Sequence, residues 1–266
     1  MTSDDPLDVY VVTVREYYYV PAFLTDIFES DQVRIRGIAA TPATLGGEHI
    51  ITFAAKLFRH FGPLIFGKQV RFYFTFLLLD IYARITGRGE AYSPKTLASR
   101  HDVPYMAKDD IGEPAFLETV REIDPDVVVS VAATQRFETE LLDIPSHGCI
   151  NVHSSLLPAY RGVSPSFWSL YHDEDRTGIT VHYMDEELDS GDIILQRPVP
   201  IEPDDTVHTL NERVATEGAA VLSEALAHIR NGTVNPIPME TEKGSYYSLP
   251  ERDDVQDFRE RGNRFY

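Results

Sequence analysis

The sequence predicts an α/β protein built on a doubly wound, mostly parallel sheet. Short β-branched runs alternate with stretches of helical periodicity, beginning with strand, helix and strand over 8–14, 21–28 and 33–40. The run VVVSVA at 127–132 is apolar almost throughout, which suits a strand buried on both faces. No G-x-G-x-x-G motif follows the first strand, so we expect no dinucleotide site at that turn.

The remaining elements continue this alternation. Pro21 suits the first turn of the first helix, and Thr206 and Asn231-Gly232 suit the cap and the stop of a long late helix. We expect one α/β domain over 1–205, followed by a C-terminal helix and a polar tail over 206–266. The further expected elements are helices over 95–101, 113–123, 206–229 and 255–261, a strand end at 103–105, and strands over 127–132, 148–152, 178–184 and 193–199.

The segment 52–84 is rich in aromatic and aliphatic residues and forms an apolar helical insertion in the predicted domain. Lys56, Arg59, Lys68, Arg71 and Asp80 interrupt it, whereas a bilayer span needs about 20 predominantly apolar residues in succession. We therefore expect no transmembrane span. Three roles stay open: packing on the core or on a partner subunit in a homodimer, contact with a membrane surface, and a lid over a substrate pocket.

Charge is the outstanding feature of the composition. The chain has 42 acidic and 24 basic residues, a net charge of −18, and only five of the basic residues are lysine. Abundant carboxylate with little lysine suits a halophilic cytoplasm, where salt screens self-repulsion. The same charge argues against a nucleic-acid partner, because phosphate requires a basic face.

Two classes of protein are disfavoured by other residues. The single cysteine, Cys149, excludes a disulfide framework within the chain and a cysteine-based zinc site, and we expect no metal. Residues 1–8 are polar and acidic, without the basic start and apolar stretch of a secretory signal, so we expect a cytoplasmic protein.

Three polar side chains suggest a site for chemistry. Asn151 and His153 lie two residues apart at the end of an apolar strand, so both side chains point to one face. The carboxyl end of a strand is where doubly wound sheets bind ligands. Asp189 follows in a Leu-Asp-Ser-Gly-Asp turn, and an aspartate brought against a histidine can keep it protonated or accept a proton. Taken singly, each residue is also explained as a structural residue of a strand end or a turn.

Together these residues form an extended pattern. It reads N-x-H-x-S-L-L-P-x-Y-R-G over 151–162, T-G-x-T over 177–180 and L-D-x-G-D over 188–192. This resembles the formyltransferase family of one-carbon metabolism, which uses 10-formyltetrahydrofolate, and the similarity is densest over 125–199. The resemblance implies a Rossmann-like catalytic domain with Asn151, His153 and Asp189 as the catalytic set. Asn151 would donate to a tetrahedral oxyanion, protonated His153 would stabilise it, and Asp189 would accept the amine proton, without a metal or a covalent enzyme intermediate.

The resemblance also places the formyl donor. Backbone groups of two segments would hold the pteridine ring, with Leu156 and Leu157 as walls; a solvated helix start is the alternative for the first segment. Arg161 would contact the substrate or fix its own loop. The residues of the two segments are Gln135, Arg136, Phe137 and Glu138, and then Asp185, Glu186, Glu187 and Leu188.

The acceptor is expected to be the amine of a small molecule, with a nucleotide-linked amino sugar ranked first. Members of the family that act on methionyl-tRNA carry a further basic C-terminal domain, whereas this acidic chain has only about 60 residues after Asp205. Methionyl-tRNA, glycinamide ribonucleotide and an unlisted amine stay open. So do a hydrolase of 10-formyltetrahydrofolate and a non-catalytic folate-binding or membrane-associated protein.

The charge composition predicts that the protein gains stability with salt. At 1 M ionic strength the screening length falls to about 3 Å, so repulsion between surface carboxylates is largely removed. The midpoint of thermal unfolding should therefore be higher in molar KCl than in dilute buffer. A midpoint that is highest in dilute buffer would contradict the halophilic interpretation.

Overall fold

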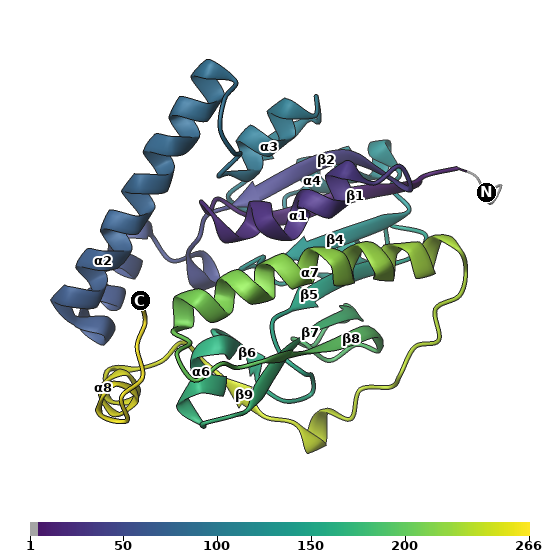
Figure 1. Ribbon diagram of the computed structural model, residues 1–266. Helices are drawn as coiled ribbons and strands as arrows, with labels where there is room; N and C mark the ends of the chain where they lie inside the picture. Colours follow the sequence, from purple (N-terminus) through teal and green to yellow (C-terminus); the bar gives the residue numbers. More distant parts are fainter. Residues whose placement is uncertain (1–4) are drawn as a thin grey trace.

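The computed structural model describes residues 5–266 as a seven-stranded sheet with helices on both faces (Figure 1). The strand order is β3-β2-β1-β4-β5-β7-β8, and β7 runs in the direction opposite to the other six strands of this sheet. The predicted α/β class with a mostly parallel sheet is thus confirmed. The strands of this sheet are β1 (Leu7–Val14), β2 (Val33–Thr41), β3 (Tyr105–Ala107), β4 (Val127–Val131), β5 (Cys149–His153), β7 (Arg176–Tyr183) and β8 (Ile193–Pro200).

Alternation along the strands divides the core into two layers. In β1, Val9 and Val11 belong to one buried cluster, whereas Tyr10 and Val12 belong to the other, because successive side chains point to opposite faces. Helices α1 (Tyr19–Glu29) and α7 (Val207–Arg230) cover the first face, together with α3 (Pro94–Arg100). Helices α4 (Pro114–Ile123) and α5 (Thr139–Leu142) cover the second.

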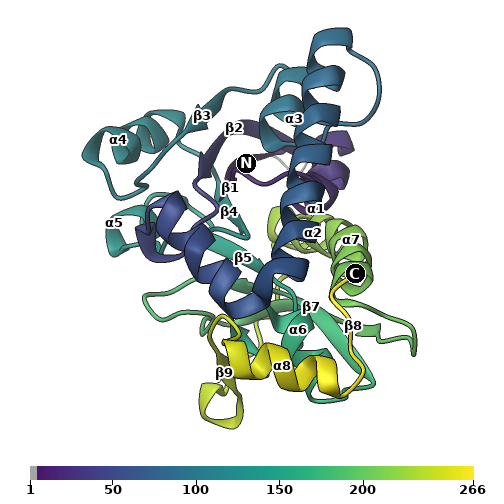
Figure 2. The ribbon, with the colours of Figure 1, turned by 90° about the vertical axis from the view of Figure 1, so that its left-hand side faces the viewer.

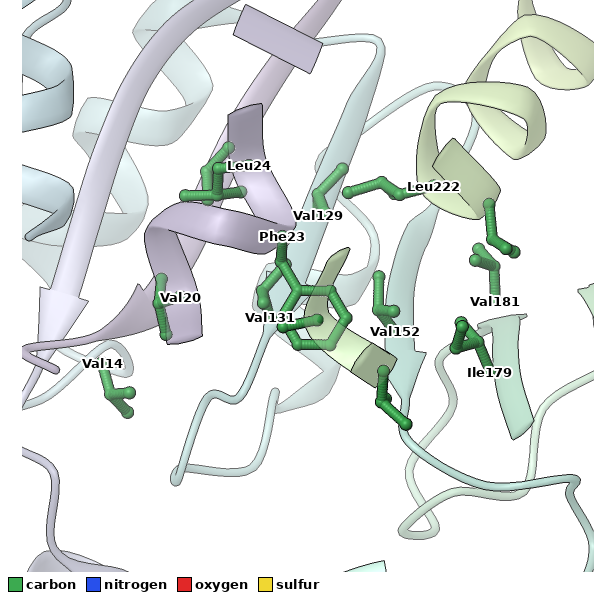
Figure 3. Packing of buried hydrophobic residues seen from close by; sticks show 14 of the residues in the cluster. Val14, Val20, Phe23, Leu24, Val129, Val131, Val152, Ile179, Val181 and Leu222 are labelled. Carbon is green, nitrogen blue, oxygen red and sulfur yellow. The ribbon is translucent and has the colours of Figure 1, made fainter. Parts of the chain in front are cut away.

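The pair α1 and α7 packs closely on the centre of the sheet. Phe23 of α1 points toward Val131 and Val152, and Leu222 of α7 lies beside Val129 (Figure 3). Thr206 caps α7 as predicted, since its hydroxyl accepts a hydrogen bond from the N–H of Thr209. Pro21 lies in the first turn of α1, also as predicted.

The segment 52–84 forms one long kinked helix, α2 (Ile50–Thr86). Gly62 has φ 75° and Pro63 follows it, so the helix changes direction there. Asp80, the one acidic residue of α2, is buried and accepts hydrogen bonds from the hydroxyls of Ser93 and Thr96. Among residues 5–266 no helix has the length and apolar character needed to cross a bilayer.

The tail returns to the loop that follows β5. Strand β9 (Tyr246–Tyr247) pairs with β6 (Arg161–Gly162), and Trp168 of α6 (Pro165–Tyr171) donates its indole N–H to the carbonyl of Ser248. Trp168 is buried, as expected of a core residue. Helix α8 (Arg252–Glu260) then lies against α2 (Figure 2). Strands β6 and β9 and helices α5 and α6 were not predicted.

The contact between α1 and α7 depends on a glycine. A Cβ on Gly218 would lie 2.2 Å from Cε1 of Phe23. Gly218→Ala should therefore destabilise the protein by about 1 to 3 kcal/mol through overpacking, despite the better helix propensity of alanine. Urea unfolding measures the difference.

The matched control is Gly67→Ala in α2, where a new Cβ would meet nothing within 4 Å. That variant should be as stable as the wild type or gain up to about 1 kcal/mol. If the two substitutions change the free energy of unfolding equally, the methyl group at position 218 does not clash with Phe23.

Candidate functional site

Strand β5 carries two polar side chains to the carboxyl edge of the sheet. Parallel pairing with β4 places Asn151 beside Ser130, and antiparallel pairing with β7 places it opposite His182. His153 lies two residues further, opposite Thr180, and is buried. Cys149 of β5 packs in one core layer and Ile150 and Val152 pack in the other, so the strand that carries the two polar groups is fixed on both faces.

Asp189 reaches this edge from the turn between β7 and β8. Its backbone has φ 51°, and its Oδ2 accepts a hydrogen bond of 2.8 Å from the N–H of Gly162. Its Oδ1 lies 3.7 Å from Nδ1 of His153. A Cβ on Gly191 would lie 2.1 Å from the carbonyl oxygen of Tyr183, which explains the glycine of this turn. The structure thus brings together the three residues that the sequence pattern indicated.

The orientation of the His153 ring follows from its partners. Nε2 lies 2.8 Å from the carbonyl oxygen of Tyr160, which can only accept, so Nε2 carries a proton. Nδ1 faces Asp189. Tyr160 is itself held by the tail, since its ring stacks on Tyr247 and its N–H donates to Ser245 Oγ. A protonated His153 would therefore be an oriented cation beside a carboxylate.

His182 is a fourth member of the site, and the sequence pattern did not indicate it. Its Nδ1 donates to the carbonyl of Tyr183 at 2.7 Å, and its Nε2 accepts from the amide of Asn151 at 3.2 Å. Nε2 also lies 3.9 Å from Oδ1 of Asp189. Burial, and secondly the nearby His153, lower the pKa of His182 to about 4. A neutral His182 thus fixes which way the carboxamide of Asn151 points.

A signal for His182 was present in the sequence. The residue lies in T-V-H-Y, on a strand that was predicted, two positions after a threonine that faces the same way. The sequence did not show which strand lies beside this one, or whether the two run parallel or antiparallel. Only the antiparallel register between β5 and β7 sets His182 opposite Asn151.

The two segments predicted to hold a pteridine ring line one narrow cavity of about 60 Å³ beside Asn151 and Asp189. Arg136 donates to the carbonyl of Glu186, and the Thr139 hydroxyl donates to the Glu186 carboxylate at 2.7 Å, so the segments are linked. The predicted residues that line the cavity are Gln135, Arg136, Phe137, Asp185, Glu186, Glu187 and Leu188.

Three other predicted residues lie away from this cavity. Leu157 is buried, and its backbone N–H donates to the hydroxyl of Thr180. Glu138 is exposed and precedes the first turn of α5. Leu156 packs against Gly178 of β7, where a Cβ would lie 2.2 Å from its Cδ2. The spacing of Leu156 within the loop did not reveal that its side chain turns toward the sheet.

Arg161 connects the loop after β5 to the turn that carries Asp189. Its Nη2 donates to the carbonyl of Leu188 at 2.9 Å. Its Nε is buried and has no hydrogen-bond partner among the described residues. Arg161 therefore fixes the Asp189 turn and still holds one N–H that a ligand could use.

The first turn of α1 is occupied by a side chain of the protein itself. The carboxylate of Glu16 accepts the N–H of Val20 at 3.0 Å, at the helix end where doubly wound sheets commonly bind phosphate. Burial raises the pKa of this carboxyl to about 7. Residues 5–266 contain no group of three or more His, Cys, Asp or Glu side chains arranged to hold a metal ion.

Comparison with known proteins gives one family. The "Formyl transferase" family matches residues 81–226, just over half of the chain. A methionyl-tRNA formyltransferase of Geobacillus thermodenitrificans is 43% identical over 152 residues, which cover 57% of this chain and 48% of that protein. One of Syntrophus aciditrophicus is 40% identical over 174 residues, which cover 64% and 56%. The chain thus spans about half the length of the curated relatives it matches.

Solved structures share the fold over more of the chain. Glycinamide ribonucleotide transformylase 1 of Symbiobacterium toebii superposes with a TM-score of 0.61 at 21% identity, covering 87% of this chain and 90% of that one. A sugar N-formyltransferase of a Shewanella species superposes with a TM-score of 0.59 at 20% identity, covering 91% and 77%. At this identity the likeness establishes the fold.

The environment of His182 predicts a pH dependence of stability. Its pKa is about 4 in the folded protein, against an ordinary value of 6.5 for a solvated histidine. The unfolded chain therefore binds more protons between these two values, so stability falls as pH falls below 6.5. His182→Gln keeps an acceptor for Asn151 but does not titrate. Between pH 6.5 and 4 the wild type should lose up to about 3 kcal/mol more than this variant in urea unfolding.

The control for this comparison is His147→Gln, at an exposed histidine outside the site. This variant should follow the wild type across the whole pH range. If His182→Gln does the same, the imidazole at 182 is not held neutral.

Proposed function

Because the chain belongs to the formyl transferase family, we propose that it transfers a formyl group from 10-formyltetrahydrofolate to an amine nitrogen. The observation that carries this proposal is the convergence of Asn151, His153 and Asp189 next to the cavity lined by the two predicted donor-binding segments. The hydrolase and the non-catalytic scaffold stay as outcomes of the test below.

The reaction requires three events at one carbon. The lone pair of a neutral amine attacks the formyl carbon, and the carbonyl oxygen becomes an oxyanion. The former amine nitrogen then loses a proton. Finally the bond between the formyl carbon and N10 of the folate breaks, and N10 takes up a proton. The site must therefore stabilise a negative oxygen and move a proton from one nitrogen to another.

Asn151 suits the first task. One N–H of its carboxamide is committed to Nε2 of His182, so the second N–H has a fixed direction and can donate to the oxyanion. A preorganised donor of this kind typically contributes about 3 kcal/mol to the transition state. His182 takes no part in the chemistry and acts by orienting Asn151.

His153 is placed to stabilise the negative charge of the oxyanion, and Asp189 is placed to accept the proton of the amine. Nε2 of His153 donates to the carbonyl of Tyr160 and Nδ1 faces Asp189, so a protonated ring would act on the oxyanion through its field. Asp189 Oδ2 is held by the N–H of Gly162, which leaves Oδ1 to accept the amine proton directly or through a water molecule.

The residues around the cavity fit the donor. The cavity joins Asn151 and Asp189 to the backbone of 135–137 and 184–188, and the pteridine ring is a planar group with many hydrogen-bonding atoms. Arg136 and Glu186, one from each segment, both line this cavity and are hydrogen-bonded to each other, so we expect the two segments to separate when the ring binds. Arg161 lies in the neighbouring loop, and its Nε has no partner among the described residues. We infer that this N–H binds the acceptor.

For the acceptor, the sequence relatives favour methionyl-tRNA over the amino sugar that was ranked first. Both relatives described above are methionyl-tRNA formyltransferases, at 40 to 43% identity. These relatives also count against the expectation that the protein has no nucleic-acid partner. The net charge of −18 remains the observation in favour of a small amine, and it keeps the amino sugar as the second candidate.

Substitution tests the assigned chemistry. Asn151→Ala should lower kcat/KM for formyl transfer about a hundredfold or more, because the oxyanion loses its donor. His153→Ala and Asp189→Asn should each lower it at least as much. The measurement is release of tetrahydrofolate with acceptor present, in molar salt, with urea unfolding to verify each fold. A variant with near-normal turnover would remove that residue from the proposed mechanism.

The acceptor is tested by supplying methionyl-tRNA and nucleotide-linked amino sugars separately and looking for a mass gain of one formyl group. Formylation of methionyl-tRNA supports the first candidate, and formylation of the sugar amine supports the second. Release of tetrahydrofolate without any amine would identify a hydrolase. Binding of the donor without release would identify a scaffold.

A further inference from the structure

Helix α2 exposes most of the large apolar side chains found at the surface of the described chain. Leu64 is 76% exposed, Leu78 is 65% exposed and Ile85 is 77% exposed. Solvent-exposed apolar groups of this number and contiguity mark a contact surface. Of the 14 exposed large hydrophobic residues in the described part, these eleven belong to α2: Ile50, Ile51, Phe58, Leu64, Val70, Tyr73, Phe74, Leu78, Leu79, Tyr82 and Ile85.

The inner side of α2 packs against the rest of the protein. Phe61, Ile65 and Ala83 are buried, and Asp80 binds Ser93 and Thr96. Figures 1 and 2 show α2 along one side of the molecule, with no element outside it. We call the eleven exposed apolar residues the α2 outer face. Tyr73 makes an edge contact with the ring of Tyr17, and the other ten stay exposed on the described chain.

The charge of α2 is opposite to that of the protein. The helix has five basic residues, Lys56, Arg59, Lys68, Arg71 and Arg84, and its one acidic residue is buried. The whole chain, by contrast, has a net charge of −18. Lys56 pairs with Glu48, whereas Arg59, Arg71 and Arg84 form no ion pair within residues 5–266. An exposed helix with cations and no exposed carboxylate complements an anionic partner.

We propose that the α2 outer face docks on an anionic lipid surface, with its apolar side chains inserted among the lipids and its arginines at the phosphates. Helices that lie in a membrane interface combine these two features. Docking, not spanning, follows because no helix of residues 5–266 can cross a bilayer. The proposal goes beyond the proposed formyl transfer and does not depend on it.

A lipid surface fits better than a second copy of this chain. A two-fold interface between outer faces would bring Arg71 and Arg84 of two copies together, and α2 offers no exposed carboxylate to pair with them. Contact with an acidic surface elsewhere on a second copy would be heterologous and would continue into an open filament unless it closed into a ring. An anionic lipid layer offers an apolar interior to the exposed side chains and phosphate groups to the arginines.

Docking would also orient the catalytic edge. Figure 2 looks onto the edge of the sheet at which β1, β4 and β5 end, and the first part of α2 crosses in front of it. The kink at Gly62 then turns the second part of α2 along α1 and α3. Asn151 and His153 lie at the same edge, so docking through α2 would place the mouth of the site near the lipid surface.

Vesicle flotation of the full chain tests the proposal. With phosphatidylglycerol-containing vesicles the protein should float with the lipid, and with pure phosphatidylcholine it should stay at the bottom. Leu78→Gln with Ile85→Gln should lower the lipid-bound fraction about tenfold or more, because two inserted side chains are lost. Arg71→Gln and Arg84→Gln should each lower the affinity roughly fivefold at moderate salt and less in molar salt.

Two matched controls lie outside α2. Ile237→Gln removes an apolar side chain that is 59% exposed, and Arg176→Gln removes an exposed arginine. Both should float like the wild type. Light scattering of the lipid-free protein completes the test. A monomer that floats supports the proposal, whereas a monomer that binds no vesicle at any salt overturns it. A dimer that Leu78→Gln with Ile85→Gln dissociates, without vesicle binding, would assign the face to a second copy instead.

Discussion

The antiparallel pairing of β7 with β5 is the constraint on which the candidate site depends. It sets His182 opposite Asn151, and the connection over 184–192 that follows β7 brings Asp189 to His153. Because β7 runs antiparallel to β5, Tyr183 near its end lies opposite Ile150, and the residues that follow extend back as far as His153. The one reversed strand of the sheet therefore converts two polar residues of β5 into a site with four members.

Around this pairing, the loop after β5 is fixed by contacts from distant parts of the chain. Gly162 donates its N–H to Asp189, and Arg161 donates to the carbonyl before Asp189. The tail adds β9 to β6 and stacks Tyr247 on Tyr160, whose carbonyl orients His153. The tail thus contributes to the geometry of the site without supplying a group that reacts, which is how preorganised sites are commonly built.

Charge is distributed unequally over the molecule, and this bears on what it binds. The whole chain has a net charge of −18, while α2 combines unpaired arginines with exposed apolar side chains. The relatives compared above are named methionyl-tRNA formyltransferases; tRNA is a polyanion, and an anionic lipid surface also has a negative charge. In molar salt both kinds of contact rely less on long-range attraction and more on direct contact, because the screening length is only about 3 Å.

The sequence by itself determined the class of fold, the order and approximate bounds of the long elements, and the catalytic candidates of β5 and the Asp189 turn. The elements follow from local periodicity, and the catalytic candidates follow from the motifs over 151–162 and 188–192 and from the family that these motifs resemble. Only the tertiary structure showed the contact of His182 with Asn151, the packing of Leu156 against Gly178, and the stacking of Tyr247 in the tail on Tyr160. Each of these depends on which strand lies beside which and in what direction, and such pairings between distant segments leave no periodic trace in a single sequence.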